Sequence, residues 1–280
     1  TFISPDNWYV MGDAACIFDP FYSTGMVMMA FEAEAISSTI HTKLQGDKVL
    51  AARKVKVFDE FVRAITCSCN HLISHHNKHL GNCAVMSWRQ FLELNFTFGV
   101  ATPAYVGKWN TCPDFCEAFT KALAEAYSIR EYAYNLLDEA AAKNLDMGVI
   151  SQTTGTILGF QPQYDWDYDH DLAKCRYEPK RNNIFKRIAW TNVYVSAVLI
   201  TIKYKVHGFK ALFEPEFLKL LGGQAQGMAF GTIMGIVHWI KHINTPDNTI
   251  IARQERDEFK GYVCKNLKPM PWLPEQKEMM

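Results

Sequence analysis

Hydrophobic residues along the chain change their spacing after the first dozen positions. The segment from Trp8 to Met11 is continuously apolar and follows polar residues, which is typical of a buried strand. Apolar positions at helical spacing then predict a helix from about Gly25 to Leu44. A second predicted helix has Asp47 as its N-cap and runs to about His79. The pattern therefore predicts one strand followed by helix upon helix.

Helical spacing continues almost to the end of the chain. The further predicted helices are Gly81–Phe98, Pro113–Asn144, Ile184–Tyr204, Glu214–Leu221, Gln224–Ile243 and Ile250–Cys264. Gln161–Asn183 is rich in tyrosine, aspartate, proline and charge, and we expect it to form a surface loop. Lys265–Met280 has prolines among charged residues, which predicts an extended tail. The chain is thus expected to be mainly α-helical, with one or few strands at its N-terminus.

Composition narrows the class of protein. Hydrophobic residues make up 49% of the 280 residues, enough to fill a sizeable core. Lys plus Arg and Asp plus Glu number 29 each, so the chain has no basic excess and nucleic acid is not an expected partner. The most apolar helical stretches, Ala189–Ile202 and Gly227–Ile240, fall short of the roughly 20 residues of a bilayer span, so membrane insertion is not expected. Gly227, Gly231 and Gly235 repeat at helical spacing and would let a neighbouring backbone approach closely.

The cysteines and the first residue bear on cellular context. Eight cysteines are scattered without a dense framework or a preceding signal peptide, which predicts free thiols and a reducing, cytoplasmic location. The chain starts at Thr1 and enters the apolar run within a few residues. A domain rarely begins in this way, so we expect further sequence upstream.

The residues between the apolar run and the first helix have the richest chemistry. They read Gly12-Asp13-Ala14-Ala15, then Asp19-Pro20, then Ser23-Thr24-Gly25-Met26. A glycine lets a ligand lie against the backbone, and an aspartate after a strand offers an acceptor to a polyol hydroxyl. The start of the next helix has unpaired N–H groups and a positive dipole end, which suit a halide ion or the negative charge of a reduced flavin. These residues predict an anion or cofactor cradle, with an ordinary turn and a capped helix as the alternative.

This string resembles the second FAD-binding motif of the flavin-dependent monooxygenase superfamily. Asp19-Pro20 and Ser23-Thr24-Gly25 are similar to the version in flavin-dependent halogenases and geranylgeranyl-reductase-like proteins, whereas aromatic hydroxylases tend to have Pro-Pro and Gly-Gln-Gly-Asn here. The resemblance implies an α/β, Rossmann-like parent fold that binds FAD. Residues 1–45 would then be the end of the FAD-binding domain, 46–264 a helical C-terminal domain and 265–280 a tail. Such a C-terminal part would not be active alone.

The resemblance also implies roles for single residues. The cofactor would be contacted by Gly12, Asp13, Pro20, Ser23, Thr24, Gly25 and Met26. Among these, Asp13 would bind the ribitol, Pro20 would lie near the isoalloxazine ring, and Thr24 and Gly25 would offer backbone N–H groups to the flavin edge or a halide. Tyr22 stands where tryptophan halogenases have a glutamate, which leaves a phenol, a pyrrole or a carrier-bound substrate open.

The implied reaction is an oxidation supported by FAD. Reduced FAD would react with oxygen to form a flavin hydroperoxide, and halide attack would then halogenate an aromatic or other electron-rich small molecule. A separate flavin reductase could supply the electrons. Two alternatives within the superfamily are a hydroxylase and a prenyl-chain reductase, and an alternative of another class is a non-enzymatic helical interaction module.

Three histidines raise the question of a metal site. His71, His75 and His79 recur every four residues on the predicted helix, and Cys67 lies one turn earlier, so one face could present several metal ligands. No carboxylate lies at a spacing that would orient these imidazoles, and helical histidines are also common at solvated or partner-facing surfaces. We therefore expect no metal site.

Overall fold

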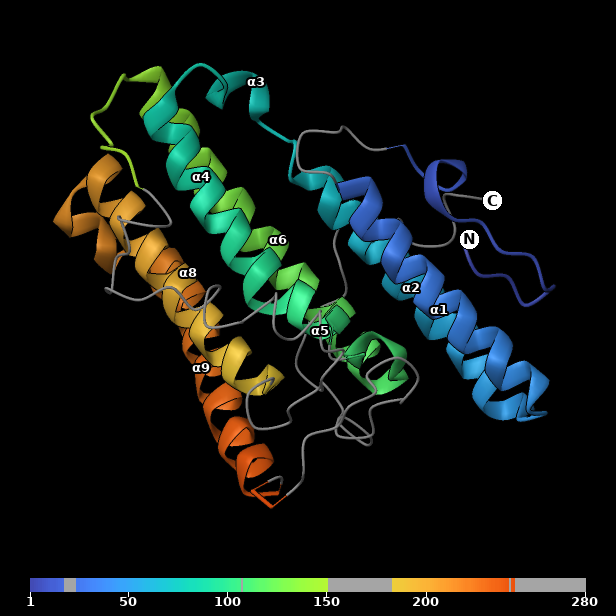
Figure 1. Cartoon of the computed structure of the whole chain (residues 1–280). Helices are drawn as coiled ribbons and strands as arrows, with labels where there is room; N and C mark the ends of the chain where they lie inside the picture. Colours follow the sequence, from blue (N-terminus) through green and yellow to red (C-terminus); the bar gives the residue numbers. More distant parts are fainter. Residues whose placement is uncertain (18–23, 107, 151–182, 242, 245–280) are drawn as a thin grey trace. The chain divides into compact units, whose positions relative to one another are not determined.

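The structure is a computed structural model that describes residues 1–17, 24–106, 108–150, 183–241 and 243–244 (Figure 1). These residues divide into two compact units. Unit 1 takes Thr1–Ser74 and Lys108–Ser128, and unit 2 takes the other described residues. The predicted helix Ile250–Cys264, the predicted tail and the predicted loop before Asn183 lie outside the described residues. The domain boundary predicted near residue 45 stays a prediction.

The first residues of unit 1 are extended, but they do not form the predicted buried strand. Ile3 and Tyr9 form an isolated antiparallel bridge, and the N–H of Val10 donates to the carbonyl of Phe2 at 2.9 Å. Trp8 is 47% exposed. A strand needs hydrogen-bonded neighbours along its edges, and among the described residues only the short segment around Ile3 pairs with this one. The prediction of a strand is therefore wrong for the described part of the chain, which is mainly helical as expected.

Two long helices dominate unit 1. The first, α1, spans Thr24–Leu44, which confirms the predicted start near Gly25. The second, α2, spans Lys48–His71, and the two lie side by side in Figure 1. The carboxylate of Asp47 accepts the N–H of Leu50 at 2.9 Å, which confirms Asp47 as the N-cap of α2.

The core of unit 1 is rich in aromatic side chains. A short 3-10 helix, η4 (Trp109–Thr111), and the first part of α6 (Pro113–Ala142) complete the unit. The ring of Phe61 on α2 lies 5.8 Å from the ring of Phe31 and 6.0 Å from that of Phe119, between centroids. Such edge-to-face pairs stabilise a core beyond the area that they bury.

The second helix ends earlier than its sequence pattern predicts. α2 stops at His71, and only a single turn, α3 (His76–His79), lies beyond it. His75 between them has a φ of 61°, in the left-handed region, which interrupts the helical hydrogen bonds. His71 belongs to unit 1 and His79 to unit 2, so the predicted histidine face does not exist.

Unit 2 is a group of helices with an apolar core. Its elements are α4 (Cys83–Phe96), the π-helical η3 (Thr97–Ala101), α5 (Thr102–Val106), the second part of α6, α8 (Ile184–His207), η6 (Phe209–Phe213) and α9 (Pro215–Lys241). The core combines side chains from α4, α6 and α8, including Trp88, Phe91, Leu137, Tyr194 and Val198. No helix in the described ranges is long and apolar enough to cross a membrane.

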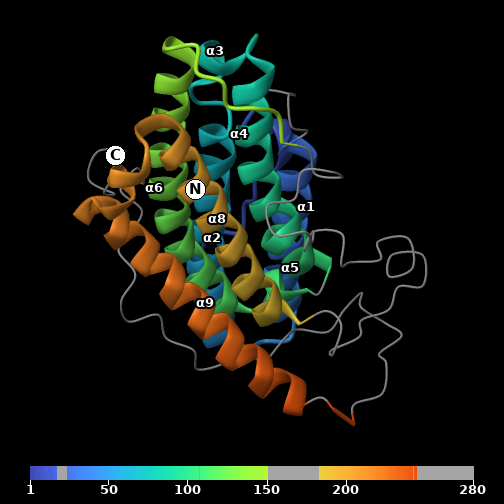
Figure 2. The same ribbon diagram turned by 90° about the vertical axis from the view of Figure 1, so that its left-hand side faces the viewer.

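Helices α8 and α9 pack with their backbones in contact, side by side in Figure 2. A Cβ atom added at Gly231 would lie 2.5 Å from the amide nitrogen of Ala189 and 2.7 Å from the carbonyl oxygen of Phe185. This contact confirms the close approach predicted from the glycine spacing. Asn183 joins the two helices as well, since its side chain caps α8 through the N–H of Phe185 and donates to the carbonyl of Gly235 at 2.8 Å.

Candidate functional site

The Gly-Asp turn forms a short 3-10 helix, η1 (Gly12–Ala14). Gly12 has a φ of 61°, a conformation that glycine adopts without the steric penalty of a side chain. Its carbonyl accepts the N–H groups of Ala15 at 2.9 Å and Cys16 at 3.1 Å. These bonds close a tight turn directly after the extended segment.

The turn is tied to α1 by a residue that the sequence analysis missed. The N–H of Gly12 donates to Oε2 of Glu32 at 2.7 Å. Glu32 is only 1% exposed, and burial raises the pKa of its carboxyl, while the hydrogen bond from Gly12 acts in the opposite direction. Glu32 shares its buried helix face with Met28 and Phe31. A lone carboxylate on this apolar face is the signal that could have pointed to it.

The other predicted cofactor residues follow Gly12 in the sequence, up to the first turn of α1. The side chain of Asp13 is exposed and has no partner among the described residues. Thr24 is buried, Gly25 is half-buried and Met26 is 67% exposed at the start of α1. Pro20 and Ser23 lie outside the described residues. The structure thus brings Gly12 against α1, with Glu32 as the connecting residue.

Both long helices of unit 1 hold the segment that leads into the turn. The carboxylate of Asp59 on α2 accepts the N–H groups of Phe2 at 2.6 Å and Ile3 at 3.0 Å. The ammonium of Lys43 on α1 donates to the hydroxyl of Tyr9 at 3.0 Å. Both α1 and α2 therefore contact the segment that leads to Gly12.

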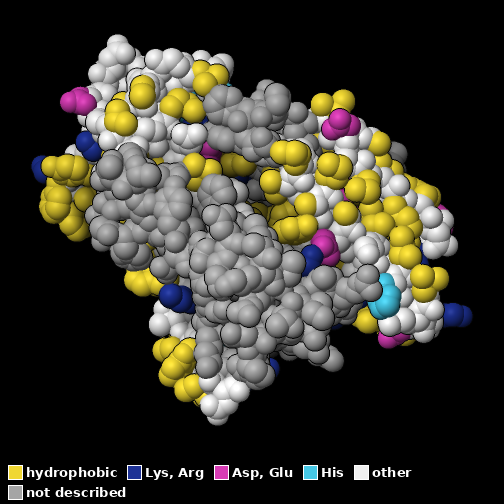
Figure 3. All heavy atoms as spheres, in the orientation of Figure 1, with side chains coloured by type: hydrophobic (Ala, Val, Ile, Leu, Met, Phe, Trp, Pro, Cys, Tyr) yellow, Lys and Arg dark blue, Asp and Glu magenta, His cyan; other side chains and the backbone are white. Residues whose placement is uncertain are grey.

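Apolar side chains are exposed around the turn and along the first part of α1. They are Trp8, Met11, Ile17, Met26, Val27 and Met29. Figure 3 shows hydrophobic side chains gathered at the surface over the part of the molecule where α1 lies. Several large apolar groups close together on one surface typically mark a binding face.

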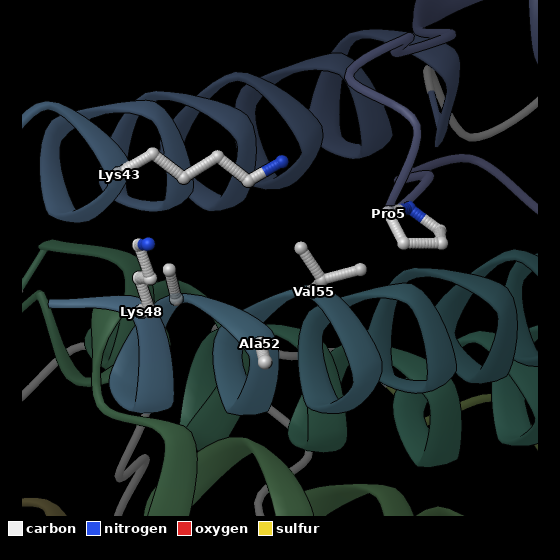
Figure 4. A pocket seen from close by; sticks show the side chains of 6 residues that line it. Pro5, Lys43, Lys48, Ala52 and Val55 are labelled. Atoms are coloured by element: carbon white, nitrogen blue, oxygen red, sulfur yellow. The ribbon is translucent and has the colours of Figure 1, made fainter. Parts of the chain in front are cut away.

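A shallow pocket of about 290 Å³ lies near the opposite end of α1 from Gly25. Figure 4 shows that Pro5, Lys43 and Val55 line it together with Lys48 and Ala52. The ammonium of Lys43 is already bonded to Tyr9, and the pocket contains none of the motif residues. We therefore do not assign the cofactor to this pocket.

The histidines form no metal site among the residues that the structure describes, where no group of three or more ligands comes together. His71 stacks on the ring of Tyr127 with centroids 3.9 Å apart, within unit 1. His75 and His79 instead approach the two carboxylate oxygens of Asp138 in unit 2, with nitrogen to oxygen distances of 2.8 and 2.9 Å. The four-residue spacing suggested one shared helix face, but the break at His75 separates His71 from His79.

A buried ionic network surrounds His79 in unit 2. Nδ1 of His79 lies 2.8 Å from the guanidinium of Arg89, and since arginine can only donate, the histidine nitrogen accepts. Arg89 also donates to the carboxylate of Glu93 at 2.8 Å, and the hydroxyl of Tyr134 donates to the same oxygen. Burial and the charge of Arg89 lower the pKa of His79 to about 4, although Asp138 acts in the opposite direction. His79 is therefore neutral in the folded protein at pH 7.

This neutral histidine predicts a loss of stability in mild acid. The pKa of His79 is about 4 in the folded state and about 6.5 in the unfolded state, so the unfolded chain binds more protons between these values. The contribution of neutral His79 to the free energy of unfolding is complete above pH 6.5 and falls as the pH decreases toward 4. Between pH 7 and 5 the free energy of unfolding should fall by about 2 kcal/mol from this group, as measured by urea unfolding.

Matched variants separate this contribution from other acid effects. His79→Gln should reduce the difference between pH 7 and pH 5, whereas His41→Gln, at an exposed position on α1, should leave it unchanged. Equal pH dependence in the His79→Gln variant and the unchanged protein would contradict the assignment.

Comparison with known proteins gives a related sequence. The chain is 38% identical over 264 residues, or 94% of its length, to the flavin-dependent halogenase ChlA of Dictyostelium discoideum. It spans 44% of the length of that protein. No protein-family model matches the chain, and no solved structure matches it. The resemblance to flavin-dependent halogenases that the Gly-Asp motif indicated is thereby confirmed over nearly the whole chain.

Proposed function

We propose that this chain is part of an FAD-dependent halogenase and that the Gly12 turn and the start of α1 form one side of its FAD site. The observation that carries the proposal is the 38% identity to the Dictyostelium halogenase over 94% of the chain. The motif is the reason for proposing this place within unit 1. Because the chain spans 44% of that relative, we propose that a Rossmann-like FAD-binding domain is completed by residues outside it.

The described residues suit this cofactor. The exposed carboxylate of Asp13 is available to accept hydrogen bonds from the ribitol hydroxyls. Thr24 and Gly25 lie in the first turn of α1, where N–H groups have no partner within the helix and can donate to the flavin edge or a halide ion. The exposed side chain of Met26 offers apolar surface beside them.

The protein contributes placement to the reaction. FAD, when bound, supplies the oxidising chemistry with oxygen, and the residues of this chain bind, orient and exclude water. Asp13 fixes the polyol chain, and the N–H groups at the start of α1 favour negative charge at the flavin edge or on a halide. Gly12 and Gly25 keep side chains away from the ligand.

The substrate follows from the halogenase proposal. An aromatic or other electron-rich small molecule, free or carrier-bound, would be halogenated, with electrons from a separate flavin reductase in the cytoplasm. The test uses the complete protein with reduced FAD, oxygen and either chloride or bromide. Halide-dependent incorporation into product supports a halogenase, whereas an oxygenated product without halide identifies a hydroxylase. Reduction without oxygen consumption identifies a prenyl-chain reductase.

Asp13→Ala in the complete protein should weaken FAD binding by about 1 to 3 kcal/mol, because a buried ribitol hydroxyl would lose its acceptor. FAD remaining after dialysis, measured by visible absorption, gives the result. Asp6→Ala removes another exposed carboxylate from the same N-terminal segment and should leave FAD content unchanged. Equal FAD content in the two variants would remove Asp13 from the site.

A further inference from the structure

Glu32 occupies a costly position for a carboxylate. It lies on the inner face of α1 with an exposed fraction of 1%, next to Met28 and Phe31, where a leucine or methionine would be expected. A buried carboxylate loses its hydration and needs hydrogen-bond donors in exchange. Among the residues that the structure describes, the N–H of Gly12 is such a donor, at 2.7 Å from Oε2.

The bond holds the one residue of the turn that has an unusual backbone. Gly12 has a φ of 61°, and an added Cβ would meet Sδ of Met29 on α1 at 3.6 Å. When the N–H of Gly12 is directed into α1, the peptide plane before the turn is fixed. The adjacent Asp13 then presents its side chain to solvent. Glu32 therefore constrains the backbone directly before Asp13.

We propose that Glu32 is a positioning residue for FAD: its carboxylate holds the Gly12 turn against α1 so that Asp13 faces the ribitol. This inference rests on the proposed function. It adds Glu32, the ninth residue of α1, which the Gly-Asp motif does not contain.

Substitutions at position 32 distinguish positioning from simple packing. Glu32→Met fills the same space without an acceptor and should weaken FAD binding in the complete protein about tenfold, because the N–H of Gly12 would lose its hydrogen-bond partner. Glu32→Gln keeps a side-chain oxygen that can accept from Gly12, and its dissociation constant should stay within about threefold of the unchanged protein. Glu32→Asp keeps the carboxyl group but is one methylene shorter and cannot reach Gly12, so it should resemble Glu32→Met.

Glu34→Met is the matched control, because it removes a carboxylate from the same helix that pairs with Lys108 rather than with the turn. Its FAD affinity should be unchanged. Melting temperature and the dissociation constant for FAD, from flavin fluorescence, are measured on every variant. A packing role would change the melting temperature of Glu32→Met and leave its FAD affinity unaltered.

The outcomes separate this inference from the proposed function. If the unchanged complete protein binds no FAD, the proposed function is overturned, and the role of Glu32 is overturned with it. If the unchanged protein binds FAD, and both Glu32→Met and Glu32→Asp bind FAD as tightly as the unchanged protein does, only the role of Glu32 is overturned. If Glu32→Met fails to fold, the ratio between Glu32→Asp and Glu32→Gln decides, and equal affinities in these two variants overturn the inference.

Discussion

Replacing Gly231 with alanine should destabilise unit 2 by about 2 to 3 kcal/mol. The new Cβ would lie 2.5 Å from the amide nitrogen of Ala189 and 2.7 Å from the carbonyl oxygen of Phe185. Both are backbone atoms of α8, so no side chain can rotate away and the helices must separate. Alanine is a better helix former than glycine by about 1 kcal/mol, which offsets only part of this cost. Urea unfolding followed by circular dichroism measures the change.

The same helix provides the control for that experiment. Gly222 lies earlier in α9, and a Cβ added there would meet no atom within 4 Å. Gly222→Ala should therefore stabilise the protein by up to about 1 kcal/mol through helix propensity alone. Equal stability in the two alanine variants would show that α8 and α9 do not meet at Gly231.

Gly25→Val should abolish flavin-dependent turnover in the complete protein while the fold stays nearly intact. Valine is no worse than glycine as a helix former, so the start of α1 should tolerate it. Its branched side chain would nevertheless block a ligand from the N–H groups of the first helical turn. Activity and melting temperature are measured on the same variant.

Thr24→Ser accompanies this variant because it keeps every backbone donor of the first turn. We expect its turnover to remain close to normal, with a small loss of stability, since Thr24 is buried and loses a methyl group. Normal activity in Gly25→Val would exclude the start of α1 from the cofactor site. A parallel fall in stability and activity would instead mean that Gly25 acts through folding.

Local signals were sufficient to predict most helices. Asp47 caps α2 because its short side chain reaches back to the backbone three residues later, a property that can be recognised from residue type. The break at His75 could not be predicted, since no glycine or proline marks it and a left-handed histidine is uncommon. Glycines at 222 and 223 suggested two helices where the structure has the single α9, because a helical glycine costs only about 1 kcal/mol and packing can offset it.

Part of the candidate site could be predicted because it is also defined by residue types close together in sequence. Gly12, Asp13, Thr24 and Gly25 lie within fourteen positions of one another in sequence, and their residue types suggest a cradle. Glu32 acts on Gly12 across twenty positions of sequence, and such a contact depends on how the turn packs against α1. The predicted strand at Trp8 failed for a related reason, because an apolar run indicates burial while a strand also requires partners.

Among the described residues, unit 1 combines Thr1–Ser74 with Lys108–Ser128, which follows a segment of unit 2 in the sequence. Phe119, which contacts Phe61, belongs to this second stretch. During synthesis, the surface of α2 that contacts Phe119 therefore stays uncovered until this second stretch has been made. The neighbouring helices α8 and α9 need no such delay, since their contacts are close in sequence and can form quickly. We therefore expect the α8–α9 pair to form faster once it has been synthesised than the α1–α2 pair, which depends on residues distant in sequence.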